Sequence, residues 1–260
     1  MVITFSSDFG TADPYTAIVK GVILSINPKA KIIDLSHELT THDIRRAAFF
    51  VASACPVYPV GTIHLCVVDP GVGSNRKPML LVTEKGIYVG PDNGLFSLIW
   101  QNSKHKTAYW LKNSRYFFKD TSRTFDARDV FGPTAAYLSL GVAPEEFGSV
   151  VRSINLLRLP EPAGQATRRG RHFNGEIIYI DRFGNLVTNF AYEMVQGKNA
   201  EVKLGSRKMK GLVPNYGSIP KGQIAHILGS LGYLEIAGNA VSAQRLLKAK
   251  IGTKVDLELL

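Results

Sequence analysis

Residues 63–73 read Ile-His-Leu-Cys-Val-Val-Asp-Pro-Gly-Val-Gly, an apolar run that ends in an acid, a proline and two glycines. A continuous apolar segment of this length, closed by turn residues, is typical of a strand buried on both faces of a parallel sheet. Ligands of open α/β sheets bind beyond the carboxyl ends of such strands. Asp69, which follows the run directly, is therefore the first candidate for a side chain that faces a ligand.

Segments of strand-like and helix-like spacing alternate on both sides of this run. In chain order they are strand 2–6, helix 15–26, strand 31–35, helix 43–55, strand 63–68, strands 79–83 and 87–89 joined as a hairpin, and helix 128–140. Pro28 and Pro56 follow the first two helices, because a residue without a backbone N–H cannot continue a helix. This order predicts an α/β fold, with an N-terminal mostly parallel α/β sandwich domain that carries helices on both faces of its sheet.

The pattern changes at residues 157–171, a stretch rich in Pro, Gly and Arg without apolar periodicity. Such a composition is typical of a linker. Short strands separated by turns follow it, at residues 176–180, 186–189, 200–204, 224–228, 233–237 and 254–259. The sequence therefore predicts an N-terminal α/β domain over residues 1–157, a linker over 158–170, and an all-β domain, a small barrel or sandwich, over 171–260.

The composition narrows the class of protein. Hydrophobic residues make up 45% of the 260 residues, so the chain can bury a core. No apolar run reaches the roughly 20 residues of a membrane helix, and the first ten residues do not resemble a signal peptide. The two cysteines, Cys55 and Cys66, lie in apolar surroundings and indicate core packing. We therefore expect a cytoplasmic protein without a membrane partner.

The net charge of +10 raises the question of nucleic-acid binding. The excess is concentrated near the end of the chain, where residues 168–260 hold 14 Lys and Arg against 7 Asp and Glu. No recognition motif accompanies this charge, and the basic residues are scattered singly along the expected strands. We interpret them as a solvated surface and expect no nucleic-acid partner.

Two acids follow predicted strands of the same sheet. Asp8 ends the first strand and Asp69 ends the third, which places both at one sheet edge, although either could simply cap a turn. Arg76 lies seven residues after Asp69, far enough for the loop to fold back and pair the two side chains. The glycines between them do not form a phosphate loop, because no Gly-Lys-Ser or Gly-Lys-Thr closes the segment.

Two further clusters carry acids. Asp126 lies in Thr-Phe-Asp-Ala-Arg-Asp at residues 124–129, where it or Thr124 could cap the helix that follows. Asp181 and Asn185 bracket a tight turn between two strands, which they could simply stabilise. The six histidines show no metal-ligand spacing, and no Gly-x-Ser-x-Gly element or Cys–His pairing indicates a covalent nucleophile. We expect no metal.

Taken in order, these segments resemble the S-adenosylmethionine hydrolase family, the hydroxide adenosyltransferases, which is related to the fluorinases and chlorinases. The resemblance covers essentially the whole chain. It rests on Ser-Asp-Phe-Gly at 7–10, Val-Asp-Pro-Gly-Val-Gly at 68–73, Gly-Pro-Asp-Asn-Gly at 90–94, Thr-Phe-Asp-Ala-Arg-Asp at 124–129, Asp-Arg-Phe-Gly-Asn at 181–185 and Gly-Tyr-Leu-Glu-Ile-Ala at 232–237. Each motif is weak by itself, but the ordered set across two domains is specific.

The resemblance implies a C-terminal β-barrel domain and a homotrimer, in which the ligand lies between the N-terminal domain of one subunit and the C-terminal domain of its neighbour. It implies S-adenosyl-L-methionine as the substrate, cleaved by water at the ribose C5′ to adenosine and L-methionine without a further cofactor. By position, the implied binding residues are Asp8 at the ribose hydroxyls, Phe183 and Tyr216 beside the adenine, Asn185 at the adenine edge, and Asp181, Ser230 and Glu235 around the methionine end. Carboxylates, aromatic rings and amides suit the hydroxyls, the purine and the ammonium group of that ligand.

The family carries an Asp–Arg–His set around the attacking water. Asp69 and Arg76 match its first two members, but Asp126 stands where the family has His. Ala127 and Gly229 also replace a common Gly and a common Asn. We therefore predict Asp69, Arg76 and Asp126 as the catalytic residues. A non-catalytic protein that binds adenosine or S-adenosylmethionine is the alternative, and a halogenase is a more distant one, since two acids would repel a halide.

Overall fold

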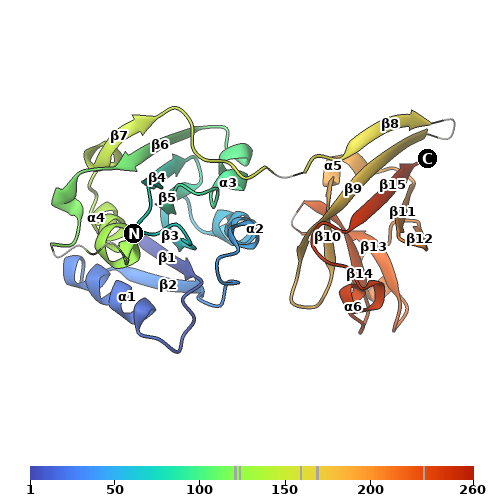
Figure 1. Ribbon diagram of the computed structural model, residues 1–260, viewed down its shortest axis with the longest axis horizontal. Helices are drawn as coiled ribbons and strands as arrows, with labels where there is room; N and C mark the ends of the chain where they lie inside the picture. Colours follow the sequence, from blue (N-terminus) through green and yellow to red (C-terminus); the bar gives the residue numbers. More distant parts are fainter. Residues whose placement is uncertain (120–121, 123, 159, 168–169, 231) are drawn as a thin grey trace. The chain divides into compact units, whose positions relative to one another are not determined.

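The computed structural model describes residues 1–119, 122, 124–158, 160–167, 170–230 and 232–260. The chain divides into two compact units, Met1–Leu157 and Arg158–Leu260, each with a hydrophobic core of its own (Figure 1). Residues 159, 168 and 169 of the predicted linker lie outside the described residues.

The first unit is built on a seven-stranded sheet in the order β2-β1-β3-β5-β4-β6-β7. Its strands are β1 (Val2–Ser7), β2 (Lys31–Ser36), β3 (Thr62–Val67), β4 (Pro78–Thr83), β5 (Gly86–Pro91), β6 (Lys106–Leu111) and β7 (Gly148–Val151). The first four strands in this order pair in parallel, and the remaining pairs are antiparallel. The sheet is mixed because the predicted hairpin of β4 and β5 reverses the direction of the chain.

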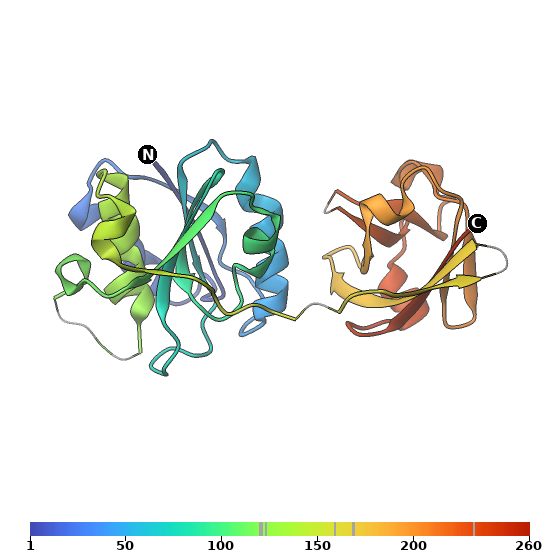
Figure 2. The same ribbon diagram turned by 90° about the horizontal axis from the view of Figure 1, so that it is seen from above.

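Helices cover both faces of this sheet. They are α1 (Tyr15–Ile26), α2 (Ile44–Ala54), α3 (Ser97–Asn102) and α4 (Gly132–Ser139), with the 3₁₀-helices η1 (Cys55–Val57), η2 (Ser114–Tyr116) and η4 (Pro144–Phe147), and a π-helix, η3 (Ala127–Phe131). Figure 2 shows α1 and α4 on one face and α2 and α3 on the other. Ile63 and Leu65 pack toward the first pair of helices, whereas Cys66 and Val68 pack toward the second. Burial on both faces explains the apolar run at residues 63–68.

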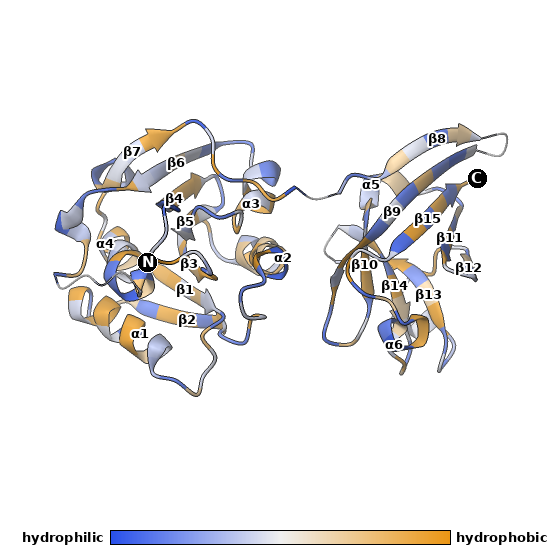
Figure 3. Cartoon of the chain, in the orientation of Figure 1, coloured by the Kyte–Doolittle hydropathy of each residue, from blue (hydrophilic) through white to orange (hydrophobic). Residues whose placement is uncertain are grey.

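The second unit is a nearly closed antiparallel barrel. Its strand order is β12-β11-β15-β9-β10-β14-β13, with β8 paired to β9. The strands are β8 (Ala163–Thr167), β9 (Gly170–Ile180), β10 (Leu186–Ala191), β11 (Ala200–Leu204), β12 (Arg207–Lys210), β13 (Ile224–Leu228), β14 (Tyr233–Gly238) and β15 (Lys254–Leu259), with α5 (Tyr192–Val195), η5 (Tyr216–Ser218) and α6 (Ala243–Leu247) between them. Figure 3 shows the alternation of polar and apolar residues along β15, where Val255 and Leu257 enter the core.

Two sequence predictions need correction. Residues 163–167 of the predicted linker form β8, which pairs with β9 although all five of its residues are exposed. Backbone hydrogen bonds rather than apolar burial hold such a strand, so its sequence shows no alternation. The helix predicted over residues 128–140 begins as η3 and continues as α4. Pro133 has no backbone N–H to donate to the Asp129 carbonyl, and this carbonyl accepts from Phe118 N at 2.8 Å instead. Because the regular helical hydrogen bond is missing there, the first turn adopts the wider π-helical form.

Among the helices of the described ranges, none combines the length and the apolar character that crossing a membrane requires.

Candidate active site

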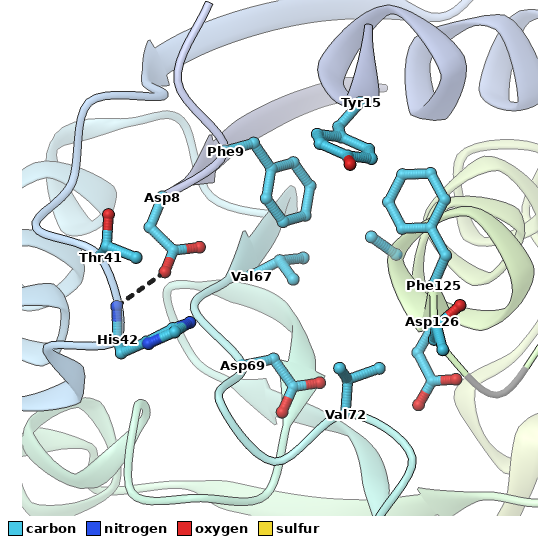
Figure 4. A pocket seen from close by; sticks show the side chains of 12 residues that line it. Asp8, Phe9, Tyr15, Thr41, His42, Val67, Asp69, Val72, Phe125 and Asp126 are labelled. Atoms are coloured by element: carbon cyan, nitrogen blue, oxygen red, sulfur yellow. Dashed lines mark hydrogen bonds between the residues drawn. The ribbon is translucent and has the colours of Figure 1, made fainter. Parts of the chain in front are cut away.

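Two carboxylates meet at the carboxyl edge of the first sheet because their strands are neighbours. β1 and β3 pair in parallel with Ser7 opposite Val67, so the residues that follow the two strands emerge side by side. Asp8 and Asp69 line one cavity of about 240 Å³ (Figure 4). The prediction that these acids share a sheet edge is therefore confirmed.

The segment that precedes η3 forms the opposite wall of this cavity. Figure 4 shows Asp126 beside Asp69, with Val72 between them and Phe125 above. The lining consists of Asp8, Phe9, Tyr15, Thr41, His42, Val67, Asp69, Val72, Thr124, Phe125, Asp126 and Ala127. The fold thus brings three acids from separate parts of the chain to one cavity.

Arg76 joins two of these acids. Its Nε donates to Asp69 Oδ1 at 2.9 Å, and one terminal nitrogen donates both to Asp69 Oδ2 and, at 2.5 Å, to Asp126 Oδ2. The bidentate pair with Asp69 is the geometry in which a guanidinium orients a carboxylate best. The side chains of Arg76 and Asp69 are only 9% and 6% exposed, so solvent screens the pair little. The pairing expected from the seven-residue spacing is present.

The Arg76 guanidinium keeps its charge in this setting. Burial by itself would lower the pKa of Arg76, but the hydrogen bonds and charges of Asp69 and Asp126 raise it above its usual value. The guanidinium also lies over the Phe131 ring, 5.3 Å from the ring centre. One guanidinium faces two carboxyl groups here, and this excess of acids suits a positively charged ligand.

The structure decides between the alternatives for these acids. Asp126 precedes η3, but its side chain makes no capping hydrogen bond. The turn after β3 is closed by backbone groups, with Val72 N donating to Asp69 O at 3.2 Å, so it does not need the Asp69 carboxylate. Both carboxylates are directed at Arg76 instead of stabilising the local backbone.

Asp8 is held by the main chain of the neighbouring loop. His42 N donates to Asp8 Oδ2 at 2.9 Å, the dashed line in Figure 4. His42 has a φ of 61°, a left-handed conformation that residues other than glycine rarely adopt. Residues with such backbone conformations are found mostly at functional sites. Asp8 therefore presents an anchored carboxylate to the cavity.

An aromatic wall beside Asp8 is a part of the site that the sequence does not predict. The rings of Phe9, Tyr15 and Phe125 contact one another edge to face, with centroids 5.4, 5.9 and 6.0 Å apart (Figure 4). In the sequence, Tyr15 simply begins a helix, and Phe9 and Phe125 count as apolar residues. The available signal is that Phe9 and Phe125 each adjoin an acid of the site, Asp8 or Asp126.

The other candidate residues lie in the second unit. Five of them line one cavity of about 770 Å³, namely Asp181, Phe183, Asn185, Tyr216 and Ser230. Phe183 and Tyr216 are 78% and 47% exposed, which is unusual for large aromatic residues. Ring faces left open in this way can stack on a flat ligand.

Asp181 and Asn185 stabilise the turn that carries Phe183. Asp181 Oδ1 accepts from Phe183 N at 2.9 Å and from Asn185 N at 2.8 Å, and Asn185 Nδ2 donates to Asp181 Oδ2 at 2.8 Å. Asn185 Oδ1 accepts from Gly238 N at 3.2 Å. The turn interpretation is therefore correct for both side chains, and this turn projects the Phe183 ring into the cavity.

Glu235 of β14 is a buried carboxylate beside this cavity. Tyr216 Oη donates to Glu235 Oε2 at 3.2 Å, and a β-carbon at position 229 would overlap the carboxylate, so Gly229 makes room for it. Burial raises the pKa of Glu235. The hydrogen bond from the Tyr216 hydroxyl lowers this pKa in part, and the charge of Asp181 raises it further. Burial, together with the charge of Glu235, raises the pKa of Tyr216 to about 12. Within the described part of the chain, no ion pair compensates Glu235, which leaves it suited to a cationic group of a ligand.

The described residues contain no group of three or more His, Cys, Asp or Glu side chains arranged to hold a metal ion.

Two family models match the chain. The SAM hydroxide adenosyltransferase N-terminal domain matches residues 3–148, and the SAM hydroxide adenosyltransferase C-terminal domain matches residues 175–256. The two matches fall in the first and the second unit, respectively.

Individual proteins match over their whole length. The (R)-S-adenosyl-L-methionine hydrolase of Thermus thermophilus is 38% identical, with 98% of each chain covered. The crystal structure of a conserved protein from Thermotoga maritima has a TM-score of 0.87 at 30% identity and covers 99% of each chain. A fluorinase of Actinoplanes sp. is 26% identical and covers 98% of this chain and 97% of its own. The predicted resemblance is thus confirmed, and the chain belongs to the SAM hydroxide adenosyltransferase family.

Proposed function

We propose that this protein hydrolyses S-adenosyl-L-methionine at the ribose C5′ and releases adenosine and L-methionine. The observation that carries the proposal is the Asp69–Arg76–Asp126 group, which lines the same cavity as the anchored Asp8 carboxylate. A base and a diol acceptor at one cavity suit attack at a ribose carbon. The name of the Thermus thermophilus relative supports the same reaction and points to the R configuration at sulfur.

The proposed chemistry is an in-line displacement. The oxygen of a water molecule attacks C5′, the C5′–S bond breaks with its electron pair going to sulfur, and the water proton passes to a base. Methionine leaves as a neutral thioether and needs no acid. The protein must hold the water about 3–3.5 Å from C5′ and exclude competing solvent.

Asp69 is the proposed base, because its carboxylate lies at the cavity in a fixed orientation. Arg76 aligns the Asp69 carboxylate through two hydrogen bonds, and Asp126 supplies a second acceptor for the water. Asp8 accepts hydrogen bonds from the ribose hydroxyls. The net negative charge of the group attracts the sulfonium of the substrate, which is lost in the products.

The second unit supplies the proposed contacts for the rest of the ligand. Phe183 and Tyr216 offer their exposed faces to the adenine. Asn185 lies at its edge, where only the hydrogen-bonding capacity not used by Asp181 and Gly238 is available. Glu235 offers the ammonium group of methionine an acceptor, with Ser230 and Asp181 nearby; Asp181 is the less available acid because its oxygens already accept from the turn. We infer a homotrimer in which each ligand contacts the first unit of one subunit and the second unit of a neighbour.

Hydrolysis is tested by incubating the purified protein with S-adenosyl-L-methionine of R or S configuration at sulfur. Chromatography should detect adenosine and methionine in equal amounts, and faster with the R form. In water enriched in oxygen-18, the label should enter the 5′-hydroxyl of adenosine. Release of an unlabelled adenosine would exclude water as the nucleophile at C5′, and binding without any product would favour a non-catalytic binding protein.

A halogenase is the less favoured alternative because of the charges in the cavity. An acid 4 Å from a halide, at an effective dielectric constant near 20, repels it by about 4 kcal/mol. Asp69 and Asp126 would both act in this way. Adding fluoride or chloride to the assay should therefore produce no 5′-halogenated adenosine.

Tyr216→Ala is expected to weaken adenosine binding by about 1–3 kcal/mol, the scale of base–aromatic stacking. Calorimetry measures this loss directly. Tyr216→Phe is the matched control, because it keeps the ring and removes only the hydroxyl that binds Glu235. An equal loss in both variants would assign the effect to the hydroxyl, and no loss in Tyr216→Ala would remove the ring from the site.

The same variant tests the shared site. Tyr216→Ala impairs the part of the site that the second unit supplies, and Asp69→Asn impairs the part that the first unit supplies. Mixed trimers should therefore regain activity, since some sites then combine two intact halves. Light scattering that shows an active monomer would contradict this arrangement.

Asp126→His is expected to leave adenosine affinity unchanged and to alter turnover together with its pH dependence. An imidazole beside Arg76 accepts from water only when neutral, so activity should fall as the pH drops below about 6.5. The wild type has no imidazole at this position and should lack this limb. A pH–rate profile that keeps its shape in the variant would take Asp126 out of the catalytic set.

A further inference from the structure

A line of polar side chains runs from the buried Ser7, which precedes Asp8, to the surface, and none of its members lines the cavity. The Ser7 hydroxyl lies 2.8 Å from His37 Nδ1, and His37 Nε2 lies 3.1 Å from Asp34 Oδ1. Lys20 Nζ binds the other oxygen of Asp34 at 2.5 Å. Ser7 ends β1 and His37 follows β2, so neighbouring parallel strands bring the two side chains together.

This Ser–His–Asp order resembles a nucleophilic triad, but its burial excludes that role. Ser7 is fully buried and His37 nearly so, which leaves no room for a substrate at the hydroxyl. The Ser7 oxygen also accepts from Phe9 N at 3.4 Å. A hydroxyl that donates to His37 and accepts from the following loop has a structural use for both of its hydrogen-bonding functions.

Ser7 and His37 also connect two loops through their backbone groups. One is the loop after β1, which carries Asp8, and the other is the loop after β2, which carries His42. Gly10 N donates to His37 O at 2.8 Å, and Leu39 N donates to Ser7 O at 3.3 Å. The chain then continues from His37 to His42, whose backbone binds Asp8. The side-chain contact between Ser7 and His37 therefore lies at the common base of both loops.

We propose that His37 is a positioning residue for substrate binding, which acts through Ser7 to hold Asp8 at the angle that the ribose hydroxyls require. The inference rests on the proposed role of Asp8. His37 does not touch the cavity; it sets the fraction of molecules in which the Asp8 loop is ready to bind. Losing it should raise the dissociation constant for adenosine and the KM for substrate, and leave kcat nearly unchanged.

Asp34 and Lys20 complete the arrangement on the outer side. Burial by itself would raise the pKa of Asp34, but Lys20 and His37 lower it. The Asp34 carboxylate lies 3.1 Å from Nε2 without the angle of a hydrogen bond. Its negative charge still favours the tautomer with the proton on that nitrogen. Nδ1 is then free to accept from the Ser7 hydroxyl, so the charge of the outer acid favours the inner hydrogen bond.

The same strand contains a matched control. Thr4 Oγ1 lies 2.8 Å from His64 Nδ1, and both residues are buried. This second hydroxyl–imidazole pair lies in the middle of β1 and β3, away from either loop. Thr4→Val and His64→Leu should therefore lower the melting temperature without changing the affinity for adenosine.

The test compares the two pairs by calorimetry with adenosine, by steady-state kinetics with S-adenosyl-L-methionine and by thermal unfolding. We expect Ser7→Ala and His37→Leu each to raise the dissociation constant and KM by about fivefold to tenfold. The double variant should lose no more than either single variant. His37→Asn, which keeps a polar atom near the Nδ1 position, should restore most of the affinity.

Unchanged affinity in Ser7→Ala and His37→Leu, with a loss of stability like that of the Thr4 and His64 variants, would overturn the inference while the proposed function stands. If His37→Leu fails to fold, the smaller change Ser7→Ala decides by the same criterion. A wild-type protein that neither binds adenosine nor cleaves the substrate would overturn the proposed function and, with it, this inference.

Discussion

Replacing Asp69 with Asn is expected to lower the turnover of S-adenosyl-L-methionine by roughly 10²–10⁴-fold, the range that one general base contributes. Asn keeps the size of the side chain and can still accept the Arg76 Nε hydrogen bond. It cannot take a proton from water. Affinity for adenosine should change little, because Asp8 and the aromatic residues are untouched, and single-turnover kinetics on saturated protein would isolate the chemical step.

Asp43→Asn is the matched control for this change. Asp43 belongs to the same unit and accepts from Arg46 N at 2.9 Å as the cap of α2, a role that Asn performs as well. Its turnover should remain within about twofold of the wild type, since no bond to the reacting atoms is involved. Equal turnover in Asp69→Asn and Asp43→Asn would show that Asp69 is a structural acid and that the proposed mechanism is wrong.

Arg76→Leu is expected to reduce both stability and turnover. Removing one partner of a largely buried ion pair typically destabilises a protein by about 3–5 kcal/mol, because the remaining charge is left uncompensated. Here two carboxylates lose their common cation. Turnover should fall by a factor comparable to that of Asp69→Asn, since the proposed base loses its orientation, and denaturant unfolding would measure the loss of stability.

The pH dependence of this loss has a defined sign. The pKa of Arg76 is raised in the folded protein, so its charge contributes stability at every pH below its ordinary pKa. In the variant, the two acids repel each other, which raises the pKa of a carboxylate in the folded state. Stability of the variant should therefore be nearest to that of the wild type in acid and should fall as the pH rises through this titration.

A second substitution separates the two consequences of losing Arg76. Adding Asp126→Asn to Arg76→Leu removes one of the two repelling charges, so stability should partly recover, whereas turnover should not. An Arg76→Leu variant as stable and active as the wild type at neutral pH would show that the Asp69–Arg76–Asp126 group contributes nothing to either property.

Much of the fold was available from the sequence because the relevant signals are local. The apolar run at residues 63–68 predicts a strand covered on both faces, and α1, α2, α3 and α4 do cover both faces of the sheet. Alternation every two residues predicts the barrel strands, as along β15. The ordered motifs predict the family, since each combines residue types at a fixed spacing. The exposed strand β8 and the π-helix η3 were not predicted, because backbone hydrogen bonds rather than side-chain patterns define them.

Only the tertiary structure decided which acids meet and what each one does. Asp126 and Asp181 are both acids beside a turn or helix start in the sequence, but Asp126 binds Arg76 whereas Asp181 binds its own turn. The contact between Ser7 and His37 likewise depends on which strands are neighbours. Sequence patterns determine which segments become strands or helices and which faces are buried. The packing of distant segments determines the partner of a buried polar group. A hydrogen bond requires a donor–acceptor distance within a few tenths of an ångström and a favourable angle, and sequence patterns do not specify either.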